Sequence, residues 1–457
     1  MPKSNREDLL NNVEELENQK KEYKISIQKL IENKLFKEAQ YMINEYERII
    51  QGDFDLYSLK ALLCMSMEDF DKAIQIIEEG LTIDYRNFDL IYNLGYLYQI
   101  KSKFIDAYNT FKKAKLYCKN DIYKMEIEKR LFELENNKEV YLYNKERNEK
   151  KNNLPKVTVV ISTYNQKENL EEAIDSFLCQ DYPNLEIIVG DDCSTDGTEE
   201  FMAKYREYKE VVYVRHKVNL GAGVNSQKIL DEYVDTKYCM LFNHDDYLIK
   251  DDYISQAVEL LSKNPNLSFV WANCKVKNEI EGKWDVTNFN LPNVINGKDY
   301  FINYETNDYP HITGVVTTIF DFEKLKVTTF GYEKTKSRDT FLYLKLMLVG
   351  DVGFINDYVS VYRIHKSSIS FNMPIEYDKS TIDEFEKLKK YAIDKINIDI
   401  NTSETWINNR VYVYVFWRFI TLWRDNKNTL EALDLLFDIR QKYPVVYNRI
   451  AKNIQSV

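Results

Sequence analysis

The first third of the chain repeats one pattern of aromatic, small and charged positions. Two sets of residues recur with a spacing of 34: Phe36, Phe70 and Phe104, and Ala39, Ala73 and Ala107. Around each set, apolar residues return every three or four positions with charged residues between them, which is the spacing of an amphipathic helix. We therefore predict an all-α repeat domain over residues 1–150, in which small residues lie where helices cross.

This 34-residue period of paired helices resembles the tetratricopeptide repeat, with copies near 20–53, 54–87 and 88–121. The proline that is usual near the end of such a repeat is absent. An ordinary helical bundle with a chance period is the alternative. Stacked helical repeats present an extended surface suited to a polypeptide, so a protein or peptide partner is expected here.

After the repeats, a polar segment precedes a different pattern. Residues 139–153 read EVYLYNKERNEKKNN and end before Pro155, and we interpret them as the linker. Short β-branched runs then alternate with amphipathic helices, which indicates a mostly parallel α/β sheet over 155–372. The predicted strands are 156–162, 185–190, 211–215, 238–242 and 269–272.

The C-terminal region, 373–457, is predicted to be a helical extension. Its segment 411–423, VYVYVFWRFITLW, is too short to cross a bilayer of about 30 Å and contains Arg418. A buried helix or a subunit contact, giving a homo-oligomer, is the first interpretation of this segment. A contact with a membrane surface is the second, and no transmembrane segment is expected.

Composition and charge narrow the classes of partner. The formal net charge of −11 and the pI of about 5.2 argue against a nucleic-acid partner, which needs clustered Lys and Arg. The six cysteines form no C-x-x-C pair, and the polar first residues do not resemble a secretory signal. A cytoplasmic protein is therefore expected.

Polar clusters with candidate chemistry follow the predicted strands. They comprise residues 162–165, 190–198, 243–246 and 336–339, together with 362–368. Ligands of open α/β sheets bind at the carboxyl ends of the strands. Adjacent carboxylates such as Asp245 and Asp246 supply the oxygen ligands that Mg²⁺ or Mn²⁺ takes when it shares a diphosphate, although an acidic pair at a strand end can also be a helix cap.

Taken in order, these clusters resemble those of the family 2 glycosyltransferases. The string VTVVISTYNQKENLEEAIDSFLCQDYPNLEIIVGDDCSTDGT, residues 157–198, is similar to the N-terminal signature of that family, and the likeness covers about 156–370. It implies a catalytic domain with the A-type glycosyltransferase fold, a Rossmann-like mixed sheet. A dehydrogenase loop at Gly221-Ala222-Gly223 is disfavoured, because Ser226 replaces the third glycine and the loop follows the third strand.

The resemblance also implies the donor site. Thr163, Tyr164, Asn165, Asp192 and Asp245 fall on nucleotide-sugar-binding positions. A carboxylate at Asp192 that accepts from an imide N–H selects uracil or thymine over cytosine, and a UDP-sugar is the first expected donor.

The resemblance also implies the metal ligands and the general base. Asp245, Asp246 and His365 fall where the family holds Mn²⁺ or Mg²⁺, although His365 can equally be a structural histidine. Asp339 falls on the general base of an inverting transfer of a hexose or N-acetylhexosamine.

Two departures from the family pattern leave other functions open. Asn243 and Arg338 occupy positions that are commonly acidic, and Arg338 is expected to lower the pKa of Asp339. The expected acceptor is a protein side chain. The alternatives are a cell-surface glycan or lipid-linked acceptor, or an inactive transferase-like binding protein.

Overall fold

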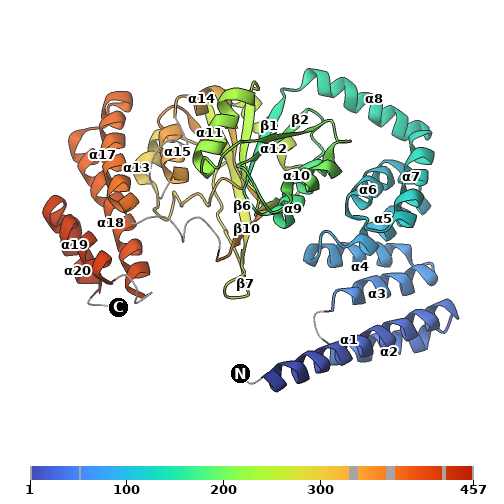
Figure 1. Ribbon diagram of the computed structural model, residues 1–457. Helices are drawn as coiled ribbons and strands as arrows, with labels where there is room; N and C mark the ends of the chain where they lie inside the picture. The colour runs from blue at the N-terminus through green and yellow to red at the C-terminus, as the bar shows by residue number, and fades with distance from the viewer. Residues whose placement is uncertain (1–2, 51–52, 329–337, 367–375, 425–428, 455–457) are drawn as a thin grey trace. The chain divides into compact units, whose positions relative to one another are not determined.

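A computed structural model describes residues 3–50, 53–328, 338–366, 376–424 and 429–454. The chain divides into two compact units, Met1–Lys150 and Lys151–Val457. Each unit has its own hydrophobic core. Figure 1 shows helices in the first unit and a sheet with helices in the second.

The first unit is all-helical in its described residues. Its helices are α1 (Lys3–Glu32), α2 (Phe36–Ile49), α3 (Asp55–Ser66), α4 (Phe70–Ile83), α5 (Phe88–Ile100), α6 (Phe104–Tyr117), α7 (Asp121–Glu135) and α8 (Lys138–Asn153). The helices α2, α4 and α6 begin at the three phenylalanines of the repeat, and each has 14 residues. The helical repeats predicted from the 34-residue period therefore fit this all-helical region.

Small residues allow these helices to approach one another. Ala39, Ala73 and Ala107 are fully buried. A Cβ atom added to Gly80 would lie 2.7 Å from a methyl carbon of Leu90, which is closer than real side chains come. The recurrent small positions in the sequence are therefore helix contacts, as the pattern predicted.

The polar segment that we interpreted as a linker is helical. Residues 139–153 lie within α8, where Val140 is the buried residue. Its lysines, glutamates and asparagines are compatible with a helix whose surface is largely exposed to solvent. Polarity in this segment indicated exposure, and it did not indicate irregular backbone.

The second unit is built on one ten-stranded mixed sheet. The strands are β1 (Val157–Thr163), β2 (Leu185–Asp191), β3 (Val211–Arg215), β4 (Tyr238–Asn243), β5 (Tyr247–Leu248), β6 (Leu267–Asn278), β7 (Lys283–Val286), β8 (Val294–Ile295), β9 (Ile319–Asp321) and β10 (Asp351–Ile364). Their order is β3-β2-β1-β4-β9-β6-β10-β5, with β7 paired to β6 and β8 to β10. The strands β1 to β4 pair in parallel, and β9 runs antiparallel to both β4 and β6.

Helices cover both faces of this sheet (Figure 1). One core joins the sheet to α9 (Lys167–Leu178) and α12 (Tyr253–Lys263). A second core joins it to α11 (Ala222–Tyr233), α13 (Gly297–Asn303), α15 (Arg338–Met347) and the C-terminal helices. This unit also contains two shorter helices, α10 (Thr198–Phe201) and α14 (Phe322–Lys326), and a 3-10 turn (Met202–Tyr205) that follows α10.

The C-terminal helices belong to the same compact unit as the sheet. They are α17 (Glu376–Ile396), α18 (Ile400–Arg424), α19 (Thr429–Lys442) and α20 (Pro444–Ile454). Trp406 of α18 stacks on Phe301 at 4.7 Å, and its ring N–H donates to the Phe301 carbonyl at 2.9 Å. The expected boundary at 372/373 lies outside the described residues.

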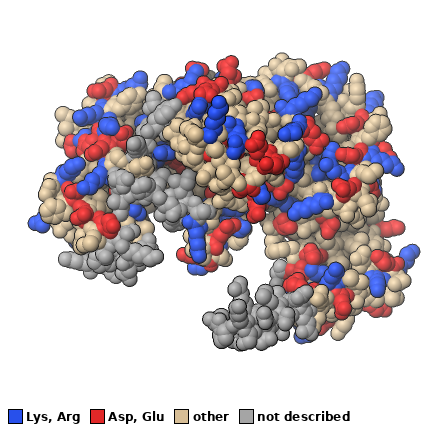
Figure 2. Space-filling view, in the orientation of Figure 1, with Lys and Arg blue, Asp and Glu red and all other residues tan. Residues whose placement is uncertain are grey.

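The aromatic stretch 411–423 lies within α18. Val411, Val415 and Phe419 are buried, whereas Trp417 is 62 % exposed. In the described part of the chain, no helix has the length and apolar character that a membrane crossing requires. On the face shown in Figure 2, acidic and basic side chains are interspersed over the described helices.

Candidate active site

The carboxyl ends of several strands meet at one edge of the sheet. In register, Thr163 at the end of β1 is opposite Asp191 of β2, and Ser162 is opposite Asn243 of β4. β10 runs parallel to β6 and ends at Ile364, directly before His365. Thr163, Asp192, Asp245, Asp246 and His365, which the sequence predicted as site residues, are therefore carried by the same edge.

Hydrogen bonds join the loop that follows β1 to the loop that follows β2. Asn165 adopts a left-handed backbone conformation with φ of 52°, which asparagine tolerates better than most residues. Its amide oxygen accepts the backbone N–H of Thr195 at 2.7 Å, and its own N–H donates to the Ser194 hydroxyl at 2.9 Å. Asn165 thus fixes the loop that presents Tyr164, whose side chain is 44 % exposed.

Asp192 is buried and holds a third loop. Its two carboxylate oxygens accept the backbone N–H groups of Leu220 at 2.7 Å and Gly221 at 2.8 Å. Its own N–H donates to the Thr163 carbonyl at 3.0 Å. Each carboxylate oxygen keeps a second lone pair, so a hydrogen bond from a ligand is still available to Asp192.

Thr163 contributes a polar atom without a partner. Its hydroxyl oxygen is buried and makes no hydrogen bond to the described residues. Buried hydroxyls are normally paired, and an unpaired one at a sheet edge indicates where a ligand group fits.

We expect Asp192→Ala to lower the free energy of unfolding by about 3 kcal/mol, because two hydrogen bonds to a buried carboxylate are lost. Denaturant titration of the purified protein measures this change. Asp235→Ala is the matched control. Asp235 is exposed and lies just after helix α11, which begins directly after the loop that Asp192 holds. Equal stability of the two variants would contradict the role of Asp192 in holding the loop.

Asp245 and His365 form a close pair. The imidazole Nε2 lies 2.8 Å from Asp245 Oδ2. Desolvation acts to raise the pKa of Asp245, but the hydrogen bond from His365 and the charges of His244 and His365 outweigh it, and the net shift is downward. The hydrogen bond to Asp245 raises the pKa of His365 in turn.

Asp246 is buried beside this pair, and only one of its two carboxylate oxygens has a hydrogen-bond partner among the described residues. Its Oδ1 accepts the backbone N–H of Arg363 at 2.8 Å, whereas its Oδ2 is buried without a hydrogen-bond partner among the described residues. Desolvation and the negative charge of Asp245 raise the pKa of Asp246 well above its ordinary value. An unpaired carboxylate oxygen next to a second carboxylate is suited to a divalent cation.

The protein does not surround such a cation by itself. In the described ranges, no group of three or more His, Cys, Asp or Glu side chains is arranged to hold a metal ion. Mg²⁺ and Mn²⁺ sites in nucleotide enzymes commonly use one or two carboxylates and complete their shell with phosphate oxygens and water. The residues present fit a cation of that kind.

Arg363 organises the acidic pair; it lies in the predicted cluster 362–368, but no role of its own was predicted for it. Its guanidinium is buried, donates to the Asp245 carbonyl at 2.7 Å, pairs with Glu172 of α9 and lies 4.6 Å from the centre of the Tyr247 ring. The feature of the sequence that could have indicated a role for Arg363 is its position between an apolar strand and His365. β10 has register shifts at Ile355/Tyr358 and Tyr358/Ser360, and such bulges re-aim the side chains that follow.

Asp339 lies in the first turn of α15. Desolvation raises the pKa of its carboxyl, although the charges of His311 and Arg338 act in the opposite direction. The expectation that Arg338 gives Asp339 a lowered pKa is therefore wrong, because the loss of solvent outweighs the neighbouring cation.

The charges of Asp339 and of the acidic pair both affect the phenol of Tyr362. Desolvation and the charges of Asp246, Asp339 and Asp245 raise the pKa of its phenol, so all three carboxylates act on one ring. Of the predicted clusters, residues 336–337 and 367–368 lie outside the described residues.

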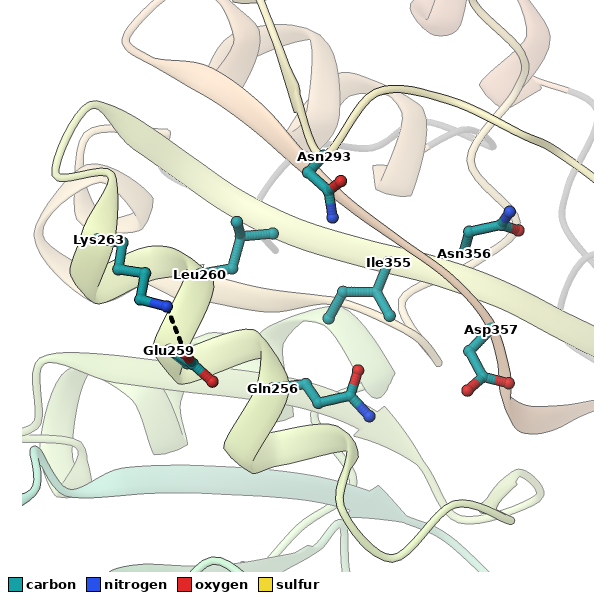
Figure 3. Close-up of a pocket in the computed structure, with 8 residues that line it drawn as sticks. All are labelled: Gln256, Glu259, Leu260, Lys263, Asn293, Ile355, Asn356 and Asp357. Carbon is teal, nitrogen blue, oxygen red and sulfur yellow. Dashed lines mark hydrogen bonds and ion pairs between the residues drawn. The ribbon is translucent and has the colours of Figure 1, made fainter.

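A cavity of about 330 Å³ lies elsewhere on this unit (Figure 3). Its lining residues come from α12, β10 and the segment before β8: Gln256, Glu259, Leu260, Lys263, Asn293, Ile355, Asn356 and Asp357. None of the predicted site residues is among them. Two of its carboxylates are already paired, Glu259 with Lys263 and Asp357 with Lys250, so the cavity offers no comparable chemistry.

Comparison with known proteins identifies the class. The model of glycosyl transferase family 2 matches residues 158–324. This part of the chain is therefore a family 2 glycosyltransferase domain, and the resemblance and A-type fold predicted from the sequence are confirmed. Asp339 and His365 lie beyond the matched residues.

Individual relatives cover a similar part of the chain. A provisionally named teichuronic acid biosynthesis glycosyltransferase, TuaG of Bacillus subtilis, is 26 % identical over 220 residues, which are 48 % of this chain and 82 % of TuaG. UDP-Glc:alpha-D-GlcNAc-diphosphoundecaprenol beta-1,3-glucosyltransferase WfgD of Escherichia coli is 24 % identical over 220 residues, 47 % of this chain and 80 % of WfgD. The solved structure of S. aureus TarS 1-349 with UDP-GlcNAc is 17 % identical, with a TM-score of 0.49, over 65 % of this chain and 83 % of that chain.

Proposed function

We propose that this glycosyltransferase moves a hexose or N-acetylhexosamine from a UDP-sugar to an acceptor, with inversion at the anomeric carbon. The observation that carries the proposal is the adjacent pair of half-buried Asp245 and buried Asp246, with one unpaired carboxylate oxygen on Asp246, at the sheet edge that also holds Thr163 and Asp192. The name of the relative WfgD, which includes UDP-Glc, supports a UDP-sugar donor.

The roles of the residues follow from their positions. Thr163 and Asp192 bind the nucleobase, while Tyr164 and Asn165 shape that pocket. Asp245, Asp246 and His365 hold Mn²⁺ or Mg²⁺, which when bound neutralises charge on the leaving diphosphate. Asp339 takes the proton of the acceptor hydroxyl as that oxygen attacks the anomeric carbon, so one displacement inverts its configuration.

Incubation of the purified protein with Mn²⁺ and a panel of UDP-sugars tests this function. Slow release of UDP from at least one donor is expected even without acceptor, because water can replace the acceptor hydroxyl. Release from GDP-sugars alone would contradict the role given to Asp192, and release from no nucleotide sugar would contradict an active transferase.

The acceptor that we propose is a protein side chain. On α7, the helix that follows the three repeats, Ile122, Met125 and Phe132 are 77 %, 72 % and 67 % exposed. Their spacing of three and seven places them along one helix face, which suits an extended polypeptide. A glycan acceptor is the second candidate, because the names of TuaG and WfgD refer to glycan and lipid-linked substrates.

Intact mass of co-expressed surface proteins, with and without the enzyme, separates the two acceptors. A hexose or N-acetylhexosamine increment on a protein supports the first. No increment on any protein, together with sugar transfer to a lipid-diphosphate glycan, supports the second.

A further inference from the structure

The helix α19 is apolar on two opposite faces. The first face consists of residues that are buried in the cores of the second unit: Ala432, Leu435 and Ile439. The second face, which we call the exposed stripe, consists of Leu430, Leu433 and Phe437, which are 77 %, 51 % and 59 % exposed. Successive residues of an α-helix turn by about 100°, so the two sets lie on opposite sides of α19. A helix that is apolar on both sides is normally covered on both.

The exposed stripe is directed away from the core of the second unit. In Figure 1, α19 lies on the side of α18 that is away from the sheet. Phe419 and Leu422 of α18 pack against Ala432, on the buried face of α19. The sequence favoured a buried helix or a subunit contact at 411–423, where Val411 and Val415 are buried within this unit. Three exposed apolar residues in line lie on α19 instead.

Charges of opposite sign flank the exposed stripe. With Phe437 as its centre, Asp434 lies about 60° to one side of the helix and Arg440 about 60° to the other. Both side chains are exposed. Asp438 lies on the same side as Asp434 and pairs with Lys379 of α17 at 2.5 Å. One side of the stripe is therefore acidic, whereas the other carries a guanidinium.

We propose that α19 pairs with α19 of a second copy of this chain, with the two helices side by side and parallel. The exposed stripes then cover each other. In a parallel pair with a twofold axis along the helices, the acidic side of one helix meets the Arg440 side of the other, as charged residues beside the seam of a parallel coiled coil do. In an antiparallel pair the two acidic sides would meet and repel each other. The inference does not depend on the proposed donor or acceptor.

The same charges argue against a membrane surface as the partner. Helices that lie on a bilayer are rich in Lys and Arg on their polar side, whereas Asp434 and Asp438 flank the exposed stripe. The formal net charge of −11 also opposes approach to anionic lipids. A second copy brings its own Arg440 to the acidic side, and a bilayer does not.

Sedimentation velocity of the full chain over a range of concentrations tests the pairing. We expect an equilibrium between one and two chains. Phe437→Ser should raise the Kd of the dimer at least about 10-fold, because this side chain covers the centre of the contact. Ile400→Ser is the matched control: Ile400 is exposed at the start of α18, and its replacement should leave the Kd unchanged. A chain that stays monomeric at every concentration, or a Phe437→Ser dimer as tight as the unmodified one, would overturn the proposal.

Charge reversal tests the parallel arrangement. Arg440→Asp should raise the Kd of the dimer about 3-fold or more, because repulsion replaces an exposed ion pair. The addition of Asp434→Arg to the same chain should bring the Kd back toward the unmodified value, since the pair is restored with its signs exchanged. An Arg440→Asp dimer that is as tight as the unmodified one would rule out the arrangement.

Vesicles of phosphatidylglycerol and phosphatidylcholine distinguish a second copy from a membrane. The unmodified chain should not cosediment with them. Cosedimentation that Phe437→Ser abolishes and Ile400→Ser does not would assign the exposed stripe to a bilayer and overturn the proposal.

Discussion

Asp339→Asn is expected to lower sugar transfer by about 10² to 10⁴, the usual contribution of a positioned general base. Asn keeps the shape of the side chain but cannot accept the acceptor proton. Affinity for the UDP-sugar should stay nearly unchanged, because Asp339 lies on α15 and the donor residues lie at the ends of β1, β2 and β4. Single-turnover kinetics with the cleaved donor, together with calorimetric binding of UDP, measure both quantities.

The pH profile gives an independent check of Asp339. Desolvation raises its pKa, and a base works only when deprotonated, so activity should fall as the pH drops through a value above the ordinary aspartate range. If Asp339 only stabilised the start of α15, Asn would serve nearly as well. A variant that melts normally and transfers sugar at the unmodified rate would therefore remove Asp339 from the mechanism.

Asp246→Asn should weaken Mn²⁺-dependent binding of UDP by about 10²-fold or more, since even residues that only orient metal ligands are worth about 10- to 100-fold in metal affinity. Chelator should abolish turnover of the unmodified protein. The thermal midpoint of the variant should not fall, because the Asp246 carboxylate is buried, repelled by Asp245 and lacks a partner at Oδ2. Loss of binding without loss of stability separates a ligand role from a structural one.

Asp357→Asn is the matched control for this experiment. Asp357 lies on β10, as Arg363 does, but pairs with Lys250 away from the strand end. Its replacement should leave the Mn²⁺ dependence unchanged. Turnover of unmodified protein at full rate in excess chelator would disprove the metal assignment.

Local patterns were enough to predict much of the fold. The apolar run at 238–242 is strand β4, because a continuous apolar run suits a strand that is buried on both faces. The run at 211–215 is the edge strand β3, whose β-branched valines favour a strand although its residues are only partly buried or exposed. The phenylalanine period located α2, α4 and α6 because the same residue begins each helix. Short-range periodicity carries this information without any knowledge of tertiary contacts.

Such local patterns could not predict the long-range contacts in the site. Arg363 acts on Asp245 and Asp246, more than a hundred residues earlier, and its burial depends on Glu172 and on the bulges of β10. The pKa of Asp339 was predicted in the wrong direction because a neighbouring charge is visible in the sequence and desolvation is not. Likewise, nothing in the sequence around Glu305 indicated that the buried Arg410 of α18 pairs with it.

The equal length and identical first residue of α2, α4 and α6 determine which insertions and deletions the first unit can accept during evolution. Gain or loss of one whole 34-residue unit places Ala39, Ala73 or Ala107 against an equivalent neighbour, so the buried contacts are conserved. An insertion of any other length rotates the apolar stripe of the following helix into solvent. Duplication of whole repeats can thus lengthen the first unit while the catalytic domain stays the same. Natural variants in the length of this unit should therefore differ by multiples of 34 residues.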